Sequence, residues 1–211
     1  MAVYIPMPKE SYSDLRERLK TKASTDEYEE KWQEIENIYR QFIDDIPDIG
    51  GKKNMMWKSL YGAIACFAWY EAFDPHPDNA EMKEVLRGNT VRGDGTGGFS
   101  KIDFNRPFVQ KIIYGIIRPV AKKFNKKKAN GTWGNTWGLD VNPLNRTEGI
   151  SIHLVGCPIA DFAKSHGYME LMPIFCQSDY EAMRSNMGKE LYREHTVAEG
   201  FDDCDYWMKN K

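Results

Sequence analysis

The stretch GISIHLVGCPIADFAKSHG, residues 149–167, carries the signals of a strand followed at once by a helix, and it decides the fold. Residues 149–155 are rich in β-branched and apolar side chains, which is typical of a strand. Pro158 suits the first position of a helix, and Gly167 supplies the left-handed conformation that commonly ends one. We therefore predict a strand that leads through a tight turn at Cys157 into a short helix.

Similar signals on both sides extend this unit. Another β-rich segment, residues 132–141, precedes the strand, and the asparagines and proline between them favour an antiparallel pair. After the helix, Ser178 and Glu181 form a capping-box signature, which predicts the start of a second helix. Two further strands are expected on either side of a glycine turn, over residues 192–198 and 203–208. The order β-β-α-α-β-β predicts an α+β fold, with helices packed on a small antiparallel sheet.

The first half of the chain has helical periodicity instead. Leu15 and Leu19 mark a first helix, and residues 54–73 are apolar nearly all round, which predicts a helix in the middle of the structure. We expect one compact unit with two regions: a helical region, residues 1–130, and an α+β region that carries the site, residues 131–211.

Composition narrows the partners. The chain has 211 residues and a formal net charge of −2, so no overall field favours nucleic acid. The most apolar stretch, residues 59–70, is about a dozen residues long, whereas a membrane span needs about twenty. Four cysteines without a secretory leader pattern predict reduced thiols and a cytoplasmic location. We expect the protein to bind a small molecule, and we expect no binding to nucleic acid, no membrane association and no cofactor. The sequence does not indicate the oligomeric state.

Cys157 is the thiol best placed for chemistry, because it adjoins the first residue of a predicted helix. The free N–H groups and the dipole at a helix start stabilise negative charge, so this position is expected to lower the pKa of the thiol and favour the nucleophilic thiolate. The alternative is a small apolar residue that packs at a strand–helix corner, since free cysteines are commonly buried.

Three acid and base candidates follow Cys157. Asp161 can share a helix face with it, whereas His166 lies roughly opposite and could simply complement the helix dipole. Glu170 has apolar neighbours on both sides, and burial there would raise its pKa and suit it to proton transfer.

The second predicted helix and the strand after it supply further candidates. Cys176 and Asp179 border the predicted helix start, so Cys176 is expected to gain a milder form of the same stabilisation. Arg193 is expected on the strand, where it would hold a substrate carboxylate in a fork or form an ordinary ion pair. Thr196 takes the other face of that strand, and Cys204 lies in the final hairpin.

Metal and phosphate motifs are weak. The residue types of a zinc site are present in Cys157, Cys176 and Cys204 together with His153 or His166. However, the sequence has no C-x-x-C or H-E-x-x-H pattern, and we predict no metal. The glycines of residues 93–98 lack the lysine of a P-loop, which indicates a flexible loop.

A family resemblance rests on these residues. The segment GCPIADFAKSHGYMELMP, residues 156–173, followed by Cys176 and Asp179, resembles the L-2-amino-thiazoline-4-carboxylic acid hydrolase family. The ending is similar to the closing pattern of that family, through Arg193, Thr196, Ala198, Gly200, Cys204, Asp205 and Tyr206. The helices before this segment resemble the family only loosely.

The resemblance implies hydrolytic opening of a small cyclic amidine of the 2-amino-thiazoline-4-carboxylate type, which yields a carbamoylated cysteine. A nucleophile must attack the carbon between sulfur and nitrogen, an acid must protonate the leaving atom, and a cation must orient the carboxylate. We assign these roles to Cys157 or Cys176 as nucleophile, Glu170 or His166 as proton carrier, Asp179 as orienting acid and Arg193 as carboxylate anchor. Asp161, Thr196 and Cys204 are expected to contact the substrate.

Two other interpretations stay open. A cysteine-led helix followed by a terminal hairpin is also similar to 4-vinyl-reductase-type small-molecule-binding domains, which would make the protein a sensor or carrier with a long apolar cavity. The third interpretation is a redox-responsive protein in which two of the late cysteines pair reversibly, and this requires their α-carbons to lie within about 7 Å.

Overall fold

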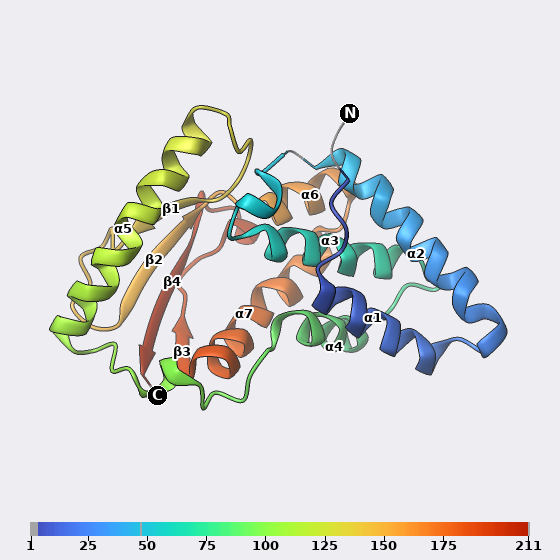
Figure 1. Cartoon of the computed structure of the whole chain (residues 1–211), viewed down its shortest axis with the longest axis horizontal. Coiled ribbons are helices and arrows are strands. Elements are labelled where there is room, and N and C mark those ends of the chain that lie inside the picture. The colour runs from blue at the N-terminus through green and yellow to red at the C-terminus, as the bar shows by residue number, and fades with distance from the viewer. Residues whose placement is uncertain (1–3, 47, 211) are drawn as a thin grey trace.

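The computed structural model describes residues 4–46 and 48–210 and has the predicted α+β fold. Figure 1 shows a group of helices on one side of the molecule and a sheet with one long helix on the other. The α-helices are α1 (Lys9–Lys22), α2 (Thr25–Asp45), α3 (Trp57–Glu71), α4 (Asn79–Thr90), α5 (Pro107–Ala129), α6 (Pro158–His166) and α7 (Met172–Met187). The strands are β1 (Gly138–Val141), β2 (Ile150–Val155), β3 (Lys189–Tyr192) and β4 (Asp203–Asn210). Short 3₁₀ turns connect them: η1 (Gly51–Lys53), η2 (Gly98–Lys101), η3 (Met169–Leu171) and η4 (Val197–Glu199).

The sheet is antiparallel, with strand order β1-β2-β4-β3. Leu154 of β2 pairs with Cys204 of β4, and the preceding His153 pairs with Asp205. Because side chains alternate along a strand, these two pairs point to opposite faces of the sheet. We call the face of Leu154 and Cys204 the inner face and the face of His153 and Asp205 the outer face.

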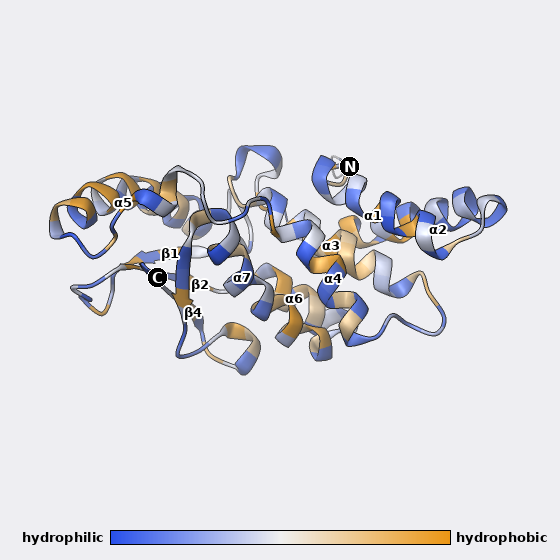
Figure 2. Cartoon of the chain, turned by 90° about the horizontal axis from the view of Figure 1, so that it is seen from below, coloured by the Kyte–Doolittle hydropathy of each residue, from blue (hydrophilic) through white to orange (hydrophobic). Residues whose placement is uncertain are grey.

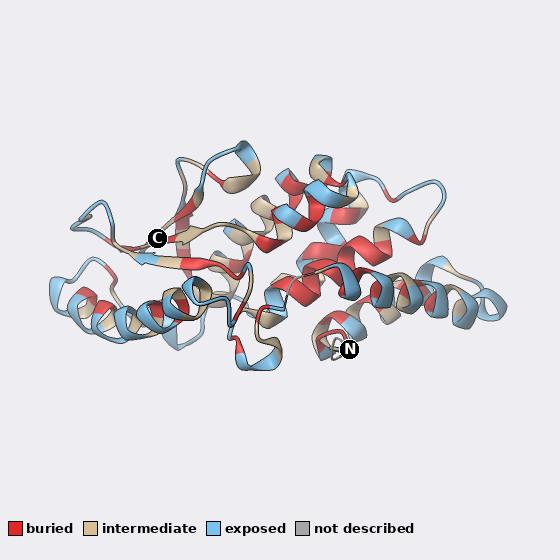
Figure 3. Cartoon of the chain, turned by 90° about the horizontal axis from the view of Figure 1, so that it is seen from above, coloured by how far each residue is buried: buried red, intermediate tan, exposed pale blue. Residues whose placement is uncertain are grey.

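Helix α3 lies at the centre of the core, as its sequence predicts. All its residues from Leu60 to Trp69 are buried (Figure 3), and α3 is among the most apolar segments (Figure 2). Phe67 stacks on Phe175 of α7 and on Tyr168, with ring centres 4.6 and 5.3 Å apart. The N-terminal helices and the C-terminal helices therefore share one hydrophobic core.

Helix α5 lies beside β1, at one edge of the sheet (Figure 1 and Figure 2). A second group of buried residues lies between α5, the sheet and the loop before α5, and it consists of Phe104, Tyr114, Ile150, Leu191 and Met208. Among the described residues, no helix has both the length and the apolar character needed to cross a membrane.

Three predicted boundaries are wrong. The first strand begins at Gly138, because the chain before it forms turns around the buried Trp133. Helix α7 begins at Met172, six residues before the predicted capping box, and the Ser178 hydroxyl donates to a carbonyl within the helix. The third strand comes earlier than expected, because Gly188 adopts a left-handed conformation that ends α7 directly before it.

Candidate functional site

A hollow of about 360 Å³ lies between the inner face of the sheet and helices α3, α4 and α7. Leu154, Cys204 and Tyr206 line its sheet side, because the β2–β4 register points all three to the inner face. The other chemically active side chains at the hollow are Cys157, Cys176, Asp179 and Arg193. The structure thus brings together five of the nine predicted site residues.

The charged side chains around the hollow are mostly cationic. Lys58, Arg92 and Arg193 line it; Lys58 pairs with Glu10 at 2.6 Å and Arg193 pairs with Asp179, so Arg92 supplies the surplus positive charge. A hollow with a surplus of positive charge attracts anions and raises their local concentration. The lining therefore favours a small ligand that carries negative charge.

Arg193 is held rigidly at the wall of the hollow. Its side chain is 2% exposed, and its guanidinium lies 4.0 Å from the ring centre of Tyr206. Nη2 donates to Asp179 Oδ2 at 2.6 Å, and Nη1 donates to the Cys176 carbonyl at 3.1 Å. Nε is buried and has no hydrogen-bond partner among the described residues. Among the three guanidinium nitrogens, Nε is therefore the one without an acceptor among the described residues.

Asp179 organises the polar side of the hollow. Its Oδ2 accepts hydrogen bonds from Arg193 and from the Tyr206 hydroxyl, the latter at 2.7 Å. Among the described residues, no side chain or backbone group bonds to its Oδ1. Burial, reinforced by the charge of Asp179, raises the pKa of Tyr206 well above its ordinary value. Tyr206 is therefore a neutral donor, and the second oxygen of Asp179 is free to accept a proton.

The Cys157 thiol is not activated in the way that the sequence suggests. Cys157 is the N-cap residue of α6, as predicted, and the backbone N–H groups of Ile159 and Ala160 stabilise its thiolate. Burial outweighs this effect and raises the pKa of Cys157 to about 12. The predicted lowering of the pKa is therefore wrong, and the thiol holds its proton at neutral pH.

The neighbouring thiols are also protonated. Burial raises the pKa of Cys176 to about 11 and raises the pKa of Cys204 as well. The Val197 N–H donates to Cys204 Sγ at 3.2 Å. Cys176 lies within α7 and not at a helix start, so the milder activation expected for it is wrong. All four cysteines are free in the structure.

Asp161 and Glu170 do not line the hollow, and both side chains are exposed. The expected burial of Glu170 is wrong, because it lies in the turn η3, where Leu171 and the following Met172 face the core instead. Neither carboxylate is therefore part of the wall of the hollow.

His166 does not line the hollow either. Its ring stacks on Phe162 with ring centres 4.0 Å apart, and its Nε2 lies 3.1 Å from Asp45 Oδ2. The Phe162 contact lies within α6, whereas the Asp45 contact links α6 to α2. His166 therefore joins two helices.

Thr196 borders a second hollow of about 450 Å³, together with His195, Cys176 and Arg193. Cys176 and Arg193 line both hollows, so the two adjoin. The predicted strand that would carry Arg193 and Thr196 on opposite faces is wrong, because β3 ends at Tyr192. Thr196 instead donates to Glu199 at 2.9 Å and stabilises the turn η4.

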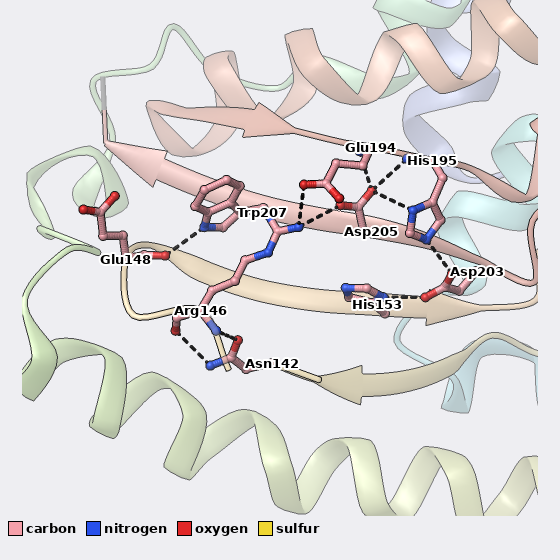
Figure 4. A network of polar contacts seen from close by, with 9 residues as sticks. All are labelled: Asn142, Arg146, Glu148, His153, Glu194, His195, Asp203, Asp205 and Trp207. Atoms are coloured by element: carbon pink, nitrogen blue, oxygen red, sulfur yellow. Dashed lines mark hydrogen bonds and ion pairs between the residues drawn. The ribbon is translucent and has the colours of Figure 1, made fainter. Parts of the chain in front are cut away.

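The sequence did not single out Tyr206 as a site residue or the polar network on the outer face that Figure 4 shows. This network contains Arg146, His153, His195, Asp203 and Asp205. The alternation of Cys204 and Tyr206 within one strand is a signal that could have placed Tyr206 at the hollow. No comparable local signal joins the network, because its members come from four separate segments: the loop before β2, β2 itself, the loop after β3, and β4.

Comparison with known proteins identifies a family. The family model of L-2-amino-thiazoline-4-carboxylic acid hydrolase matches residues 58–208. The match begins at the start of α3 and ends in β4, so it includes every hollow-lining residue except Met56. No curated protein and no solved structure matches the chain. The family supports a hydrolase-type function on a small molecule, and the chain belongs to the L-2-amino-thiazoline-4-carboxylic acid hydrolase family.

Proposed function

We propose that this protein hydrolyses a ring C–N bond in a small cyclic amidine carboxylate of the 2-amino-thiazoline-4-carboxylate class, within the hollow of about 360 Å³. The observation that carries the proposal is that Arg193, Asp179 and the thiols of Cys157 and Cys176 border this one hollow. Its volume lies in the range of small-molecule sites, about 300–1,000 Å³.

The cationic lining supports a carboxylate-bearing substrate. The free Nε–H of Arg193 is a donor for that carboxylate, and Arg92 adds positive charge at the same hollow. Nη2 already donates to Asp179, so the Nε–H is the donor that we assign to the substrate carboxylate.

The reaction needs a base and an acid. The nucleophile adds to the ring carbon between sulfur and nitrogen, the bond from this carbon to the ring nitrogen breaks, and this nitrogen takes up two protons, the number that water loses in the hydrolysis, and leaves as a primary amine. With water as nucleophile, its oxygen becomes the carbonyl oxygen of an S-carbamoyl-cysteine product. We assign the base to Asp179, because its Oδ1 is free, and the acid to a protonated thiol, Cys157 or Cys176.

Covalent catalysis by a thiol is the variant of this route that the sequence suggests. Since burial keeps the thiols protonated, an attacking Cys157 or Cys176 must lose its proton as it attacks, and Asp179 is the one carboxylate at this hollow among the described residues. Separate assays of the variants Cys157→Ser and Cys176→Ser test whether a thiol is the nucleophile. Normal turnover by both variants would remove covalent catalysis.

The main test is turnover of 2-amino-thiazoline-4-carboxylate by the purified full chain, followed by mass spectrometry of the product. We expect addition of one water, and we expect Asp179→Asn to lower kcat about a hundredfold to ten-thousandfold, as for loss of a general base. The matched control is Asp44→Asn, an exposed change at the end of α2. If the folded chain does not turn over this substrate, the proposed activity is wrong. If kcat is unchanged in Asp179→Asn, Asp179 is not the base.

Binding without catalysis is the second candidate. Several apolar side chains line the hollow, among them Trp137, Met172 and Phe175, and all the thiols there are protonated. Such walls suit a carrier or sensor. Calorimetric binding of the same carboxylate without any product would support this candidate over hydrolysis.

A further inference from the structure

Two histidines and a carboxylate converge on the outer face of the sheet. Figure 4 shows His153 on β2, Asp203 at the start of β4, and His195 on the connection after β3. One ligand atom from each of these side chains lies within 4.8 Å of the others, and they form the one such group among the described residues. Asp203 Oδ2 is hydrogen-bonded to His153 Nδ1, and Asp203 Oδ1 lies 2.6 Å from His195 Nε2.

The strand register creates this convergence. His153 pairs with Asp205, and Val155 pairs with Asp203, so both carboxylates lie on the outer face together with His153. His195 closes the group from the loop and packs on Phe201, with ring centres 4.9 Å apart. The group therefore stands on two hydrogen-bonded strands and one fixed loop residue.

A second carboxylate orients His195. Asp205 is fully buried, and its Oδ1 accepts the backbone N–H groups of Glu194 and His195 at 2.8 and 3.2 Å. The same oxygen lies 3.9 Å from His195 Nδ1, while Nε2 faces Asp203. A metal-binding histidine typically directs its other ring nitrogen to a carboxylate, and Nδ1 of His195 faces Asp205 here at a distance longer than a hydrogen bond. Arg146, 3.3 Å from Asp205 Oδ2, fixes that carboxylate in turn.

The outer face also has polar atoms without partners. His153 Nε2 and Ser151 Oγ are both buried and have no hydrogen bond within the described chain. Ser151 lies two positions before His153 and on the same face of β2. Buried polar atoms are nearly always satisfied in proteins, so an ordered water is the expected partner of these two atoms. The metal ligand that we assign to His153 is its other ring nitrogen, Nδ1, which faces Asp203.

We propose that His153, His195 and Asp203 bind a divalent transition-metal ion of the Zn²⁺ class. Two imidazole nitrogens and one carboxylate oxygen are a typical three-ligand set, and such a set leaves a coordination position for water. Ligand atoms about 2.0–2.2 Å from a tetrahedral ion lie about 3.3 Å apart, so the contacts of Asp203 must lengthen by several tenths of an ångström. The side chains of His195 and Asp203 are 20% and 24% exposed, which gives them room to move.

The proposed metal site is separate from the hollow in which we propose the ring opening. The hollow that holds Cys157 and Asp179 lies on the inner face, whereas the metal ligands lie on the outer face. His195 nevertheless lines the second hollow, so an ion there would be open to solvent. The metal proposal does not depend on the proposed hydrolase reaction.

The test is Zn²⁺ binding to the full chain after treatment with a chelator, measured by calorimetry, with the visible absorption of bound Co²⁺ as a second signature. We expect one equivalent to bind. We expect His195→Gln and Asp203→Asn each to weaken binding by more than tenfold. His76→Gln is the matched control, since the exposed His76 bonds only to the backbone carbonyls of Tyr70 and Phe73 among the described residues.

Thiols also bind Zn²⁺, so a Cys176→Ser variant must keep the wild-type affinity. Circular dichroism shows whether each variant is folded. The proposal is overturned if the folded wild-type chain binds no Zn²⁺, or if its affinity equals that of the folded His195→Gln variant. Either result would mean that Asp203 only forms hydrogen bonds to His153 and His195, and that these bonds stabilise the fold without a metal.

Discussion

The thiol of Cys157 has the backbone environment of a reactive cysteine but the solvation of a core residue. Two N–H groups at the start of α6 stabilise its thiolate, and burial disfavours the thiolate more strongly. Cys176 follows the same rule, although the charge of Arg193 partly opposes burial. At the residue scale, solvent exclusion decides the state of these thiols.

This balance predicts a loss of stability in alkali. In the unfolded chain the Cys176 thiol ionises near its ordinary pKa of 9.0, whereas in the folded chain its pKa is about 11. Below pH 9 both states hold the proton, so stability does not depend on this group there. Between these two values the unfolded state alone loses the proton, so the free energy of unfolding falls as the pH rises.

Urea unfolding over this alkaline range measures the effect. We expect the wild-type chain to lose more free energy of unfolding between pH 9 and 11 than Cys176→Ser, which lacks the thiol. Other buried acids such as Tyr206 titrate in both proteins and cancel in the comparison. If the free energy of unfolding falls with pH equally in the two proteins, Cys176 is not shielded from solvent.

At the scale of single elements, glycines set several boundaries that decide where the site residues lie. Gly167 ends α6 with a φ of +81°, and Gly188 ends α7 with a φ of +64°. The position of Gly188 places β3 directly after α7, and it leaves Arg193 on the loop that reaches the hollow. If the third strand covered residues 192–198, as the sequence predicts, Arg193 would lie within that strand and not on this loop.

A pair of glycine substitutions tests this view. We expect Gly167→Ala to lower the free energy of unfolding by about 1–2 kcal/mol, because alanine is strained in the left-handed conformation, although no atom lies within 4 Å of the added methyl. Gly115→Ala, in the middle of α5 and equally unobstructed, should instead raise it by about 0.5–1 kcal/mol. Thermal or urea unfolding gives the change in the free energy of unfolding for each variant. If both variants are stabilised, or both destabilised, the left-handed conformation of Gly167 does not explain the difference between them.

At the scale of the whole molecule, α3 joins the helical half to the half that carries the hollow. Phe67 contacts Phe175 of α7, Phe162 of α6 and Tyr168, with ring centres between 4.6 and 5.4 Å away. Because α7 carries Cys176 and Asp179, the packing of α3 also positions the proposed site.

Truncation of this contact should destabilise the entire chain. We expect Phe67→Ala to lower the free energy of unfolding by about 3–5 kcal/mol, because the side chain is fully buried. Phe108→Ala removes a ring that is 73% exposed, so it should change stability by less than about 0.5 kcal/mol. Urea unfolding followed by circular dichroism compares the two, and a cost below 1 kcal/mol for Phe67→Ala would show that α3 is not central to the core.

Local sequence determined the elements that carry their own signals. The apolar run of α3, Pro158 and Gly167 around α6, and the β-rich segment of β2 each predict their structure correctly, because neighbouring residues set helix and strand formation. The family resemblance of residues 156–173 is confirmed for the same reason, since it too is read along the chain.

Only the tertiary structure decided the rest. The sheet order β1-β2-β4-β3 depends on pairing between distant strands, and this pairing places Cys204 and Tyr206 on the inner face and Asp203 and Asp205 on the outer face. The exposure of Glu170 and the protonation of Cys157 depend on which atoms exclude water around them. Burial is a property of the packed chain, so the sequence by itself determined the elements and the family, whereas the fold decided which side chains share a hollow and hold their protons there.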